Sequence, residues 1–307
     1  MAFQPIYSVK KSDKEIKKIF VSKKYDKKVS CSVCQKNKIK WIDERKYRCQ
    51  NCWSFGSLTT GTFLEKSKLS LRKWYELAWC FAIGHPAHRA SKLIKLSSKV
   101  CWQTYQKIRK ALVIHSFLNK AQITGTVELD ESYYGGLFKN LRKEKRWQYR
   151  YQNRAKRGRG AKYRKQPVFG IYKRNGSVYL ELITSCTKRE LQEIIKRKIN
   201  KKAEVFTDDF RGYNGLVGLG YVHDTIDHGM EIYVDGRIHI NGMEGFWGLS
   251  KTNMHTYKGI RKKNWLLYLK EMEFRYNKRE LSFEKQVLEI IKILMSYRKE
   301  QFRSLST

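Results

Sequence analysis

Two kinds of periodicity follow one another along the chain. Over residues 68–120, apolar side chains recur every three to four positions, which is typical of helices that bury one face. Further along, Val127 and Leu129 alternate with Glu128 and Asp130, and this period of two is typical of a strand. The pattern therefore predicts a helical region followed by a region that opens with a strand.

After that first strand, the pattern predicts a succession of strands and helices. The expected strands cover residues 168–172, 177–183 and 203–207, and the expected helices cover residues 188–201, 242–253 and 262–300. Strands and helices that follow one another in this way pack as layers. The predicted fold class is therefore α/β.

The charge of the chain indicates a polyanionic partner. Its 307 residues include 65 lysines and arginines against 28 acidic residues, which gives a formal net charge of +37 and a pI near 10.0. With 41% hydrophobic residues and 3 prolines, the composition is that of a folding chain and excludes a basic disordered tail. A nucleic acid is the leading candidate partner, because its phosphates attract such a charge.

Apolar stretches are short throughout the sequence. None approaches the ~20 residues that a membrane-spanning helix needs, and the N-terminal 24 residues carry lysines without an apolar leader core. We therefore expect an intracellular, DNA-associated protein with no membrane contact. A bacterial cytoplasm or nucleoid and a eukaryotic nucleus are equally compatible with the composition.

Four cysteines form two pairs with metal-ligand spacing. Cys31 and Cys34 make one C-x-x-C pair, Cys49 and Cys52 make the other, and 14 residues separate the pairs. Four thiolates arranged in this way surround one tetrahedral Zn²⁺ and leave no open position, so the predicted zinc is structural. A redox pair is the weaker interpretation, because it does not require the second C-x-x-C.

Changes in pattern divide the chain into successive segments. We expect a basic N-terminal arm at residues 1–28, either a loose segment or a short helix, and then a zinc ribbon at 29–63 and a helical region at 64–120. An α/β domain is expected at 121–280, with a basic insertion at 137–165, and a C-terminal helix at 281–307.

The helical region contains a candidate helix-turn-helix. A first helix is expected from Ala87 to Leu96, a break at Ser97 and Ser98, and a second helix from about Lys99. Length and turn fit a DNA-reading helix pair, although ordinary helical hairpins share them. The candidate DNA contacts on the second helix are Gln103, Gln106 and Arg109.

The basic insertion, which we expect to form a loop, is the second candidate for a nucleic-acid contact. Residues 137–165 hold 13 lysines and arginines against the single acid Glu144, with aromatic residues between them. Basic segments with interleaved aromatics bind nucleic acid, whereas a solvated charge run is the simpler alternative. The arginines proposed to contact DNA are Arg142, Arg146, Arg154 and Arg157.

Three carboxylates stand on separate predicted elements. Asp130 lies in the first strand, Asp208 ends the strand near residues 203–207, and Glu244 lies on a helix with Trp247 and Lys251 on the same face. Pairing with neighbouring lysines would explain any one of these acids. The three together indicate two hard cations, such as Mg²⁺ or Mn²⁺, that assist an in-line phosphoryl displacement.

The sequence around these acids resembles a known family. The run Val127-Glu-Leu-Asp-Glu-Ser-Tyr-Tyr-Gly-Gly, the blocks at 207–213 and 239–251, and Phe274-Arg-Tyr-Asn-Lys-Arg are similar to insertion-sequence DDE transposases of the ISXO-like, Merlin-related type. The resemblance extends from the cysteine pairs to about residue 280. It implies a ribonuclease-H-like catalytic domain that is preceded by the zinc ribbon and the helix-turn-helix region.

The resemblance also implies an activity and its residues. It makes the chain a transposase that cleaves transposon ends and joins them to target DNA, with Asp130, Asp208 and Glu244 as the metal-binding catalytic triad. Lys251 would contact DNA near the scissile phosphate, and the ribbon and helical region would bind the terminal inverted repeats of double-stranded DNA. By analogy with other DDE enzymes, the protein would act as a homo-oligomer.

Several alternatives remain open at this stage. Asp209 could replace Asp208 as a ligand, and Asn241 could replace Glu244, although the motif and the charge favour the first of each pair. His228 and His239 could contact the substrate or support the ligands. The rival functions are a catalytically inactive or domesticated DNA-binding protein, and a nuclease that hydrolyses DNA without joining it.

Overall fold

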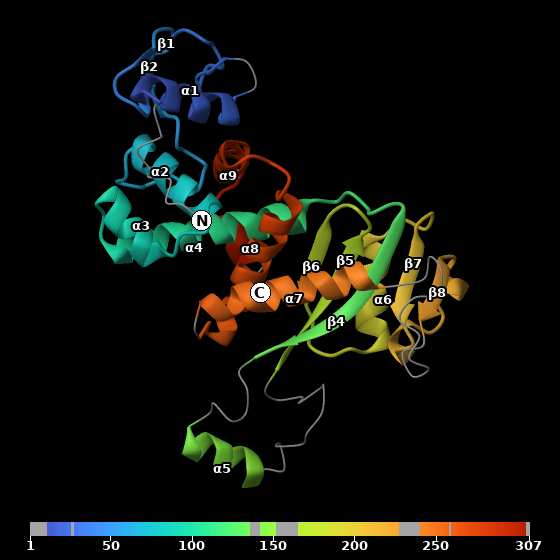
Figure 1. Cartoon of the computed structure of the whole chain (residues 1–307). Coiled ribbons are helices and arrows are strands. Elements are labelled where there is room, and N and C mark those ends of the chain that lie inside the picture. Colours follow the sequence, from blue (N-terminus) through green and yellow to red (C-terminus); the bar gives the residue numbers. More distant parts are fainter. Residues whose placement is uncertain are drawn as a thin grey trace. The chain divides into compact units, whose positions relative to one another are not determined.

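The computed structural model of the chain describes residues 11–25, 28–135, 142–151, 165–226, 240–257 and 259–304 (Figure 1). The chain divides into two compact units. The first contains Met1–Leu118 together with Lys278–Thr307, and the second contains Asn119–Asn277. No helix in the described ranges is both long enough and apolar enough to span a bilayer.

The first unit begins with a short helix, which is one of the two forms expected for its basic N-terminal segment. Helix α1 (Asp13–Lys24) starts at Ser12, whose hydroxyl accepts a hydrogen bond from the Glu15 main chain while the Glu15 carboxylate accepts one from the Ser12 main chain. Ile16 and Phe20 are buried one turn apart. Their burial against the unit explains why this lysine-rich segment is ordered as a helix.

A small antiparallel sheet follows α1 and carries the cysteine pairs. Its strands are β1 (Ile39–Trp41), β2 (Lys46–Cys49) and β3 (Phe55–Ser57), in the order β1-β2-β3. Trp41 and Tyr47 stand opposite each other and their rings meet edge to face at 5.5 Å. A sheet this small has little core of its own, so a bound metal would contribute much of its stability.

The rest of the first unit is helical. Helices α2 (Leu71–Ala82), α3 (Ala87–Ile94) and α4 (Ser98–Leu118) follow in sequence, and α9 (Phe283–Ser296) and α10 (Glu300–Ser304) come from the C-terminal end. Helix α9 packs against α1, α2 and α4. The prediction that residues 262–300 are helical is confirmed, although they form separate helices, and α9 buries the predicted apolar face within the first unit.

The second unit is built on a five-stranded mixed sheet. Its strands are β4 (Thr126–Tyr134), β5 (Gln166–Lys173), β6 (Val178–Leu182), β7 (Glu204–Asp208) and β8 (Val222–Ile226), in the order β6-β5-β4-β7-β8. Strands β4, β5 and β6 are antiparallel neighbours, whereas β7 and β8 run parallel to β4. This topology is consistent with a ribonuclease-H-like fold.

Helices cover both faces of this sheet (Figure 1). On one face, α6 (Lys188–Lys198) packs through Leu191 and Ile195 against Val127 and Leu129 of β4. On the other face, α7 (Asn241–Thr256) packs on β4 and β5, and α8 (Trp265–Asn277) packs on β6. The alternation of β4 therefore directs Glu128 and Asp130 toward α7.

The basic insertion contains one described element. Helix α5 (Lys143–Tyr151) occupies its first part, where we expected a loop, and the rings of Trp147 and Tyr151 stack at 5.3 Å on its surface. Arg142 is exposed and Arg146 is half-buried. Arg154 and Arg157 lie outside the described residues, as do His228 and His239.

Candidate functional site

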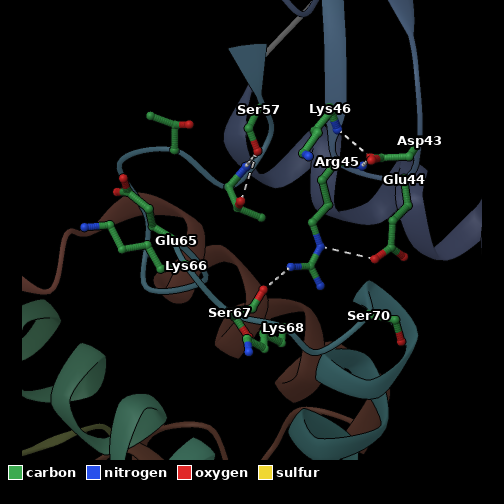
Figure 2. Close-up of a pocket in the computed structure, with 12 residues that line it drawn as sticks. Asp43, Glu44, Arg45, Lys46, Ser57, Glu65, Lys66, Ser67, Lys68 and Ser70 are labelled. Atoms are coloured by element: carbon green, nitrogen blue, oxygen red, sulfur yellow. Dashed lines mark hydrogen bonds and ion pairs between the residues drawn. The ribbon is translucent and has the colours of Figure 1, made fainter. Parts of the chain in front are cut away.

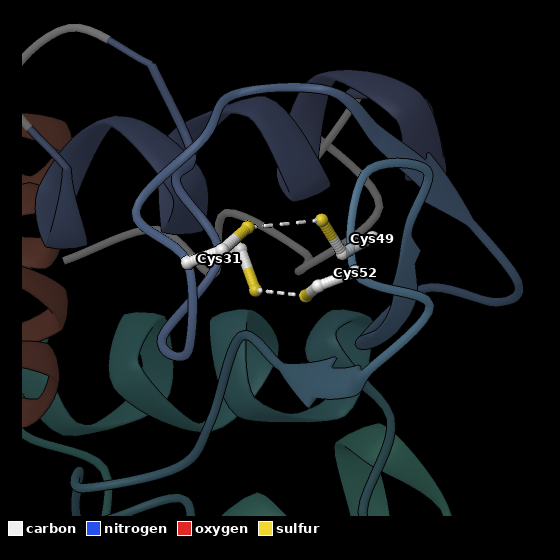
Figure 3. Close-up of side chains that lie close together, drawn as sticks. Cys31, Cys49 and Cys52 are labelled. Atoms are coloured by element: carbon white, nitrogen blue, oxygen red, sulfur yellow. Dashed lines mark hydrogen bonds between the residues drawn. The ribbon is translucent and has the colours of Figure 1, made fainter.

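The four cysteines form one compact cluster in the first unit (Figure 3). Each C-x-x-C pair forms a tight turn, and the four Sγ atoms all lie within 4.8 Å of one another. Two Sγ pairs are closer still, with Cys31 and Cys52 3.6 Å apart and Cys34 and Cys49 3.5 Å apart. Four sulfurs bound to one Zn²⁺ at about 2.3 Å lie at similar separations, so the cluster fits a structural zinc.

Hydrogen bonds favour the thiolate form at Cys31 and Cys52, whereas desolvation and the neighbouring thiols raise the pKa of Cys34 to about 11. The Ser54 hydroxyl lies 3.1 Å from Cys31 Sγ and 3.0 Å from Cys52 Sγ, and it lowers the pKa of both thiols. The main-chain N–H of Val33 donates to Cys31 Sγ and that of Asn51 donates to Cys49 Sγ, both at 3.4 Å. These donors would orient the ligands around the ion.

The three predicted carboxylates line one cleft of the second unit. The cleft has a volume of about 600 Å³, and Asp130, Asp208 and Glu244 contribute to its wall. Strands β4 and β7 are parallel, and their register pairs Glu128 with Phe206, so Asp130 and Asp208 stand two residues further along neighbouring strands. The carboxyl ends of adjacent parallel strands thus bring together two acids that are far apart in sequence.

The two alternative ligands, Asp209 and Asn241, do not line this cleft. Asp209 is exposed at the bend that follows β7, and Asn241 is exposed at the start of α7, and neither residue lines the cleft. Glu244 comes one helical turn after Ile240 and does line it. The geometry therefore favours Asp208 over Asp209 and Glu244 over Asn241.

Asp130 is held by two donors from different elements. Trp247 Nε1 on α7 donates to Asp130 Oδ2 at 2.9 Å, and the Glu131 main-chain N–H donates to Asp130 Oδ1 at 2.7 Å. Burial raises the pKa of Asp130 to about 7, and the nearby carboxylates of Asp208 and Glu244 add to the rise. Crowded acids of this kind favour a cation between them.

The donor set fits a hard divalent cation. All three side chains offer carboxylate oxygens, which are the ligands that Mg²⁺ and Mn²⁺ prefer. Among the described residues, only the four cysteines bring their ligand atoms within 4.8 Å of one another. Glu244 is exposed in this structure, and the three carboxylates do not all lie within that distance of one another.

A fourth carboxylate lies beside the triad. Glu131 lines the same cleft, and burial raises its pKa to about 8. It accepts a hydrogen bond from the hydroxyl of Tyr213, a fully buried residue in the short helix η3 (Arg211–Tyr213) that follows β7. This contact joins the end of β4 to the segment after Asp208. The sequence reasoning missed it, although both residues belong to the motifs that carried the family resemblance.

Glu128 links β4, β7 and α7, the three elements that carry the acids of the cleft. Its fully buried carboxylate accepts from Arg174 Nε at 2.8 Å and from the Met243 main-chain N–H at 2.9 Å. The Arg174 guanidinium lies 4.5 Å from the ring of Phe206 on β7. Glu128 and Phe206 lie two residues before Asp130 and Asp208, and Met243 lies directly before Glu244.

Helix α7 depends on this carboxylate for its cap. Its N-cap residue, Ile240, makes no side-chain hydrogen bond, so Glu128 supplies a cap from the neighbouring sheet. The sequence contained a sign of this role, because Glu128 places a charge on a strand face that needs none. The partner could not be read from the pattern.

Glycine allows α7 to approach the sheet closely. Gly170 on β5 stands opposite Asp130, and a Cβ atom there would come within 2.2 Å of Met243 Cε and 2.6 Å of the Trp247 ring. Gly242 on α7 would similarly strike the ring of Tyr172. A side chain at Gly170 would push Trp247 away from the Asp130 carboxylate that it holds.

Two lysines complete the wall of the cleft. Lys165 and Lys251 line it beside the carboxylates. Burial lowers the pKa of Lys251, Asp130 opposes that shift, and Lys165 adds to it. The positive groups stand where a phosphate approaching the acids would pass. Lys251 is the residue that the family resemblance assigned to DNA, and the sequence reasoning missed Lys165.

The helix pair α3 and α4 requires two corrections. The helices lie close to the expected positions, and Lys95 ends α3 in a left-handed conformation with φ of 52°. Gln103 is exposed, but Gln106 and Arg109 are buried within the helical unit, where Arg109 packs over the rings of Phe81 and Tyr105. The prediction that Gln106 and Arg109 lie on a DNA-reading face is therefore wrong, because that side of α4 faces its own neighbours.

A second pocket lies in the first unit (Figure 2). It has a volume of about 540 Å³. The carboxylate of Asp43 accepts from the main-chain N–H groups of Arg45 and Lys46 at 2.7 Å, and the Arg45 guanidinium links Glu44 to the carbonyl of Ser67. These polar groups serve the fold of the turn, so we assign no ligand to the pocket.

Comparison with known proteins matches residues 122–277, about half of the chain, to the ISXO2-like transposase domain. An uncharacterised protein in transposable element ISH50 of Halobacterium salinarum is 25% identical over 235 residues, covering 75% of this chain and 78% of that protein. An uncharacterised transposase-like protein of Haemophilus influenzae is 32% identical over 111 residues, covering 36% of this chain and 89% of that protein. No solved structure matches the chain significantly.

Proposed function

Because the chain belongs to the ISXO2-like transposase family, we propose that it binds the ends of an insertion sequence and catalyses metal-dependent cleavage and strand transfer of DNA. The observation that supports this proposal is the single cleft whose wall contains Asp130, Asp208 and Glu244 together with Lys165 and Lys251. Acids that could hold cations and bases that could hold a phosphate are the two requirements for phosphoryl transfer.

The residues of the cleft have different roles in binding cations, in positioning the acids and in holding DNA. Asp130, Asp208 and Glu244 would hold two divalent cations, which when bound would supply positive charge at the reacting oxygens. Trp247 fixes the orientation of Asp130, and Glu128 fixes the start of the helix that carries Glu244. Lys251 and Lys165 would hold the scissile phosphodiester against the acids.

The reaction proceeds as two in-line displacements. Water first attacks the phosphodiester at the element end, so that a new P–O bond forms, the bond to the 3′-oxygen breaks, and a 3′-hydroxyl is released. That hydroxyl then attacks a phosphodiester of the target and displaces the target's own 3′-oxygen, which leaves as a hydroxyl. In the second step one phosphodiester bond forms as another breaks, so no external energy source is required.

DNA binding is assigned to surfaces outside the cleft. The zinc ribbon, the exposed side of α4 with Gln103, and the basic insertion with Arg142, Arg146, Arg154 and Arg157 would hold the terminal repeat and the target. The net charge of +37 supports this assignment. Pairing two element ends in one complex would require a homo-oligomer.

A strand-transfer assay tests the proposal. Purified full-length protein is incubated with Mg²⁺ or Mn²⁺, with the flanking DNA of its own gene as donor and a supercoiled plasmid as target. Joined products are expected, and Asp208→Asn or Glu244→Gln should abolish both cleavage and joining while end binding persists. Asp209→Asn is the matched control, because Asp209 is adjacent but exposed and outside the cleft wall.

The other outcomes separate the rival functions. Binding without cleavage or joining would identify an inactive or domesticated DNA-binding protein. Cleavage without joined products would identify a hydrolytic nuclease. Strand transfer that persists in Glu244→Gln would reject the assigned triad.

A further inference from the structure

One face of the zinc ribbon presents an unusual set of side chains to solvent. Along β2, Tyr47 and Cys49 are buried, whereas Lys46 and Arg48 are exposed. The strand register places Lys40 of β1 and Phe55 of β3 on either side of Arg48. Because side chains in one cross-strand row share a face, Lys40, Arg48 and Phe55 face away from the cysteine cluster.

Two large aromatic side chains lie exposed beside Arg48. The side chain of Trp53 is 61% exposed, and that of Phe55, two residues later, is 70% exposed. The Arg48 guanidinium lies over both rings, at 4.7 Å from that of Trp53 and 5.5 Å from that of Phe55. The rings therefore hold the charged end of Arg48 in one place at the surface. We call Lys40, Arg48, Trp53 and Phe55 the outward face of the ribbon.

The backbone at Trp53 is unfavourable for its side chain. Trp53 has φ of 60°, in the left-handed region where glycine is preferred. It follows the second cysteine of its pair, and Gln35 occupies the same place after the first pair with φ of 57°. Glycine would serve the fold better at both positions. The turn after each C-x-x-C pair imposes this conformation at both positions, so it is the large exposed ring at Trp53, beneath the Arg48 guanidinium, that indicates a use outside the fold.

The charges around this face match a polyanion. Residues 28–57 contain seven lysines and arginines and two acids, Asp43 and Glu44. Both acids lie in the turn between β1 and β2, and their carboxylates accept hydrogen bonds from main-chain N–H groups. The strands themselves carry no acid, so the outward face is cationic and aromatic throughout.

We propose that the outward face of the ribbon docks on duplex DNA, with Arg48 entering a groove between Trp53 and Phe55 while Lys40 lies against a phosphate. This inference rests on the proposed function and names a surface that would carry its DNA binding. A duplex is favoured over a single strand because the guanidinium already covers one face of each ring, so the rings orient Arg48 instead of serving as open platforms for bases.

The test uses two glycine variants that are matched in backbone geometry. Trp53→Gly and Gln35→Gly both relieve a left-handed residue after a C-x-x-C pair, but only the first removes a ring from the outward face. Full-length, zinc-loaded proteins are titrated with a labelled duplex from the flanking DNA of the gene. We expect Trp53→Gly to weaken binding about tenfold, as the loss of a groove contact does, and Gln35→Gly to bind like wild type.

Two further variants distinguish groove contact from phosphate contact. Arg48→Gln should weaken binding about tenfold. Lys40→Gln should weaken binding to all duplexes equally and should lower, by about one, the magnitude of the slope of log affinity against log salt concentration. Zinc content and thermal unfolding verify the fold, and both glycine variants should retain zinc and unfold at or above the wild-type temperature.

The outcomes separate this inference from the proposed function. If wild type binds the duplex and Trp53→Gly binds equally well, or if Gln35→Gly weakens binding to the same extent, the outward face is rejected. Tighter binding of the matching single strand would reject docking in a groove. If wild type binds no DNA, the proposed function fails as well.

Discussion

The two candidate metal sites are assembled from the chain in opposite ways. The four cysteines lie between residues 31 and 52, and two short turns bring their sulfurs within 4.8 Å of one another. The three carboxylates lie between residues 130 and 244, on two strands and a helix, and they share a cleft without coming that close. One site follows from local spacing, whereas the other follows from the packing of a whole sheet.

This difference determines what supports each site. The ribbon cysteines are oriented mainly by groups two residues away, such as Ser54 for Cys52 and the main chain of each turn for Cys31 and Cys49. The acids depend on distant partners, because Trp247 holds Asp130 and Glu128 caps the helix of Glu244. A change far from the acids in sequence should therefore disturb them, while the ribbon should respond only to its own metal.

Removal of zinc should produce the largest effect. A structural zinc stabilises its domain by about 10–16 kcal/mol, so chelation or Cys49→Ser should unfold residues 29–60. Amide spectra should show those resonances lost and the resonances of the β4–β8 sheet unchanged. An amide spectrum that is unaffected by the chelator would contradict the local assembly of the ribbon.

Glu128→Gln should destabilise the acid cleft strongly. It removes the charge that pairs with the largely buried Arg174, and breaking a buried ion pair costs about 3–5 kcal/mol. Urea unfolding measures the loss, and strand transfer should fall with it because α7 is less firmly held. Glu193→Gln is the control, since its pair with Arg189 is exposed and should contribute less than about 1 kcal/mol. Equal effects of the two substitutions would argue against the cap.

The stability of the cleft should depend on pH when no divalent cation is added. Asp130 has its pKa raised from 3.8 to about 7, so between these values the folded chain holds a proton that the unfolded chain has released. Stability should therefore fall as pH rises from about 4 to about 7, by about 2 kcal/mol after allowance for solvent screening.

Denaturant midpoints of the zinc-loaded protein measure this slope. Glu131, whose pKa is raised to about 8, adds its own contribution, and the difference between wild type and Asp130→Asn isolates that of Asp130. Mg²⁺ should restore stability at pH 8 more than at pH 5, because it binds the ionised acids. A slope that is identical in Asp130→Asn would contradict the burial of this carboxylate.

Gly170→Ala should have the smallest effect on stability and a larger one on activity. The added methyl would meet the flexible end of Met243 and the Trp247 ring, at a cost of about 1–2 kcal/mol. Displacement of Trp247 would release Asp130, so strand transfer should fall more than stability does. Gly245→Ala on α7 is the control, because open space surrounds that position and alanine favours the helix. Full activity in Gly170→Ala would show that Trp247 does not position Asp130.

Local patterns in the sequence were sufficient for the features that local physics controls. The spacing of the C-x-x-C pairs predicted the sulfur cluster, because two turns need no distant partner. The period of two predicted β4, and the charge of Asp130 on that strand singled it out as a candidate ligand. The order of strands and helices predicted the α/β class, and the family motifs pointed to the acids that line the cleft.

Only the tertiary structure decided which faces meet. It buried Gln106 and Arg109 within the helical unit, placed α9 against α1 and α2, and joined Glu128 to Arg174 and Met243. Periodicity shows that a helix has a polar or an apolar face, but not what covers that face. A carboxylate that caps a helix more than a hundred residues away is fixed by the packing of the sheet, so no local pattern could reveal it.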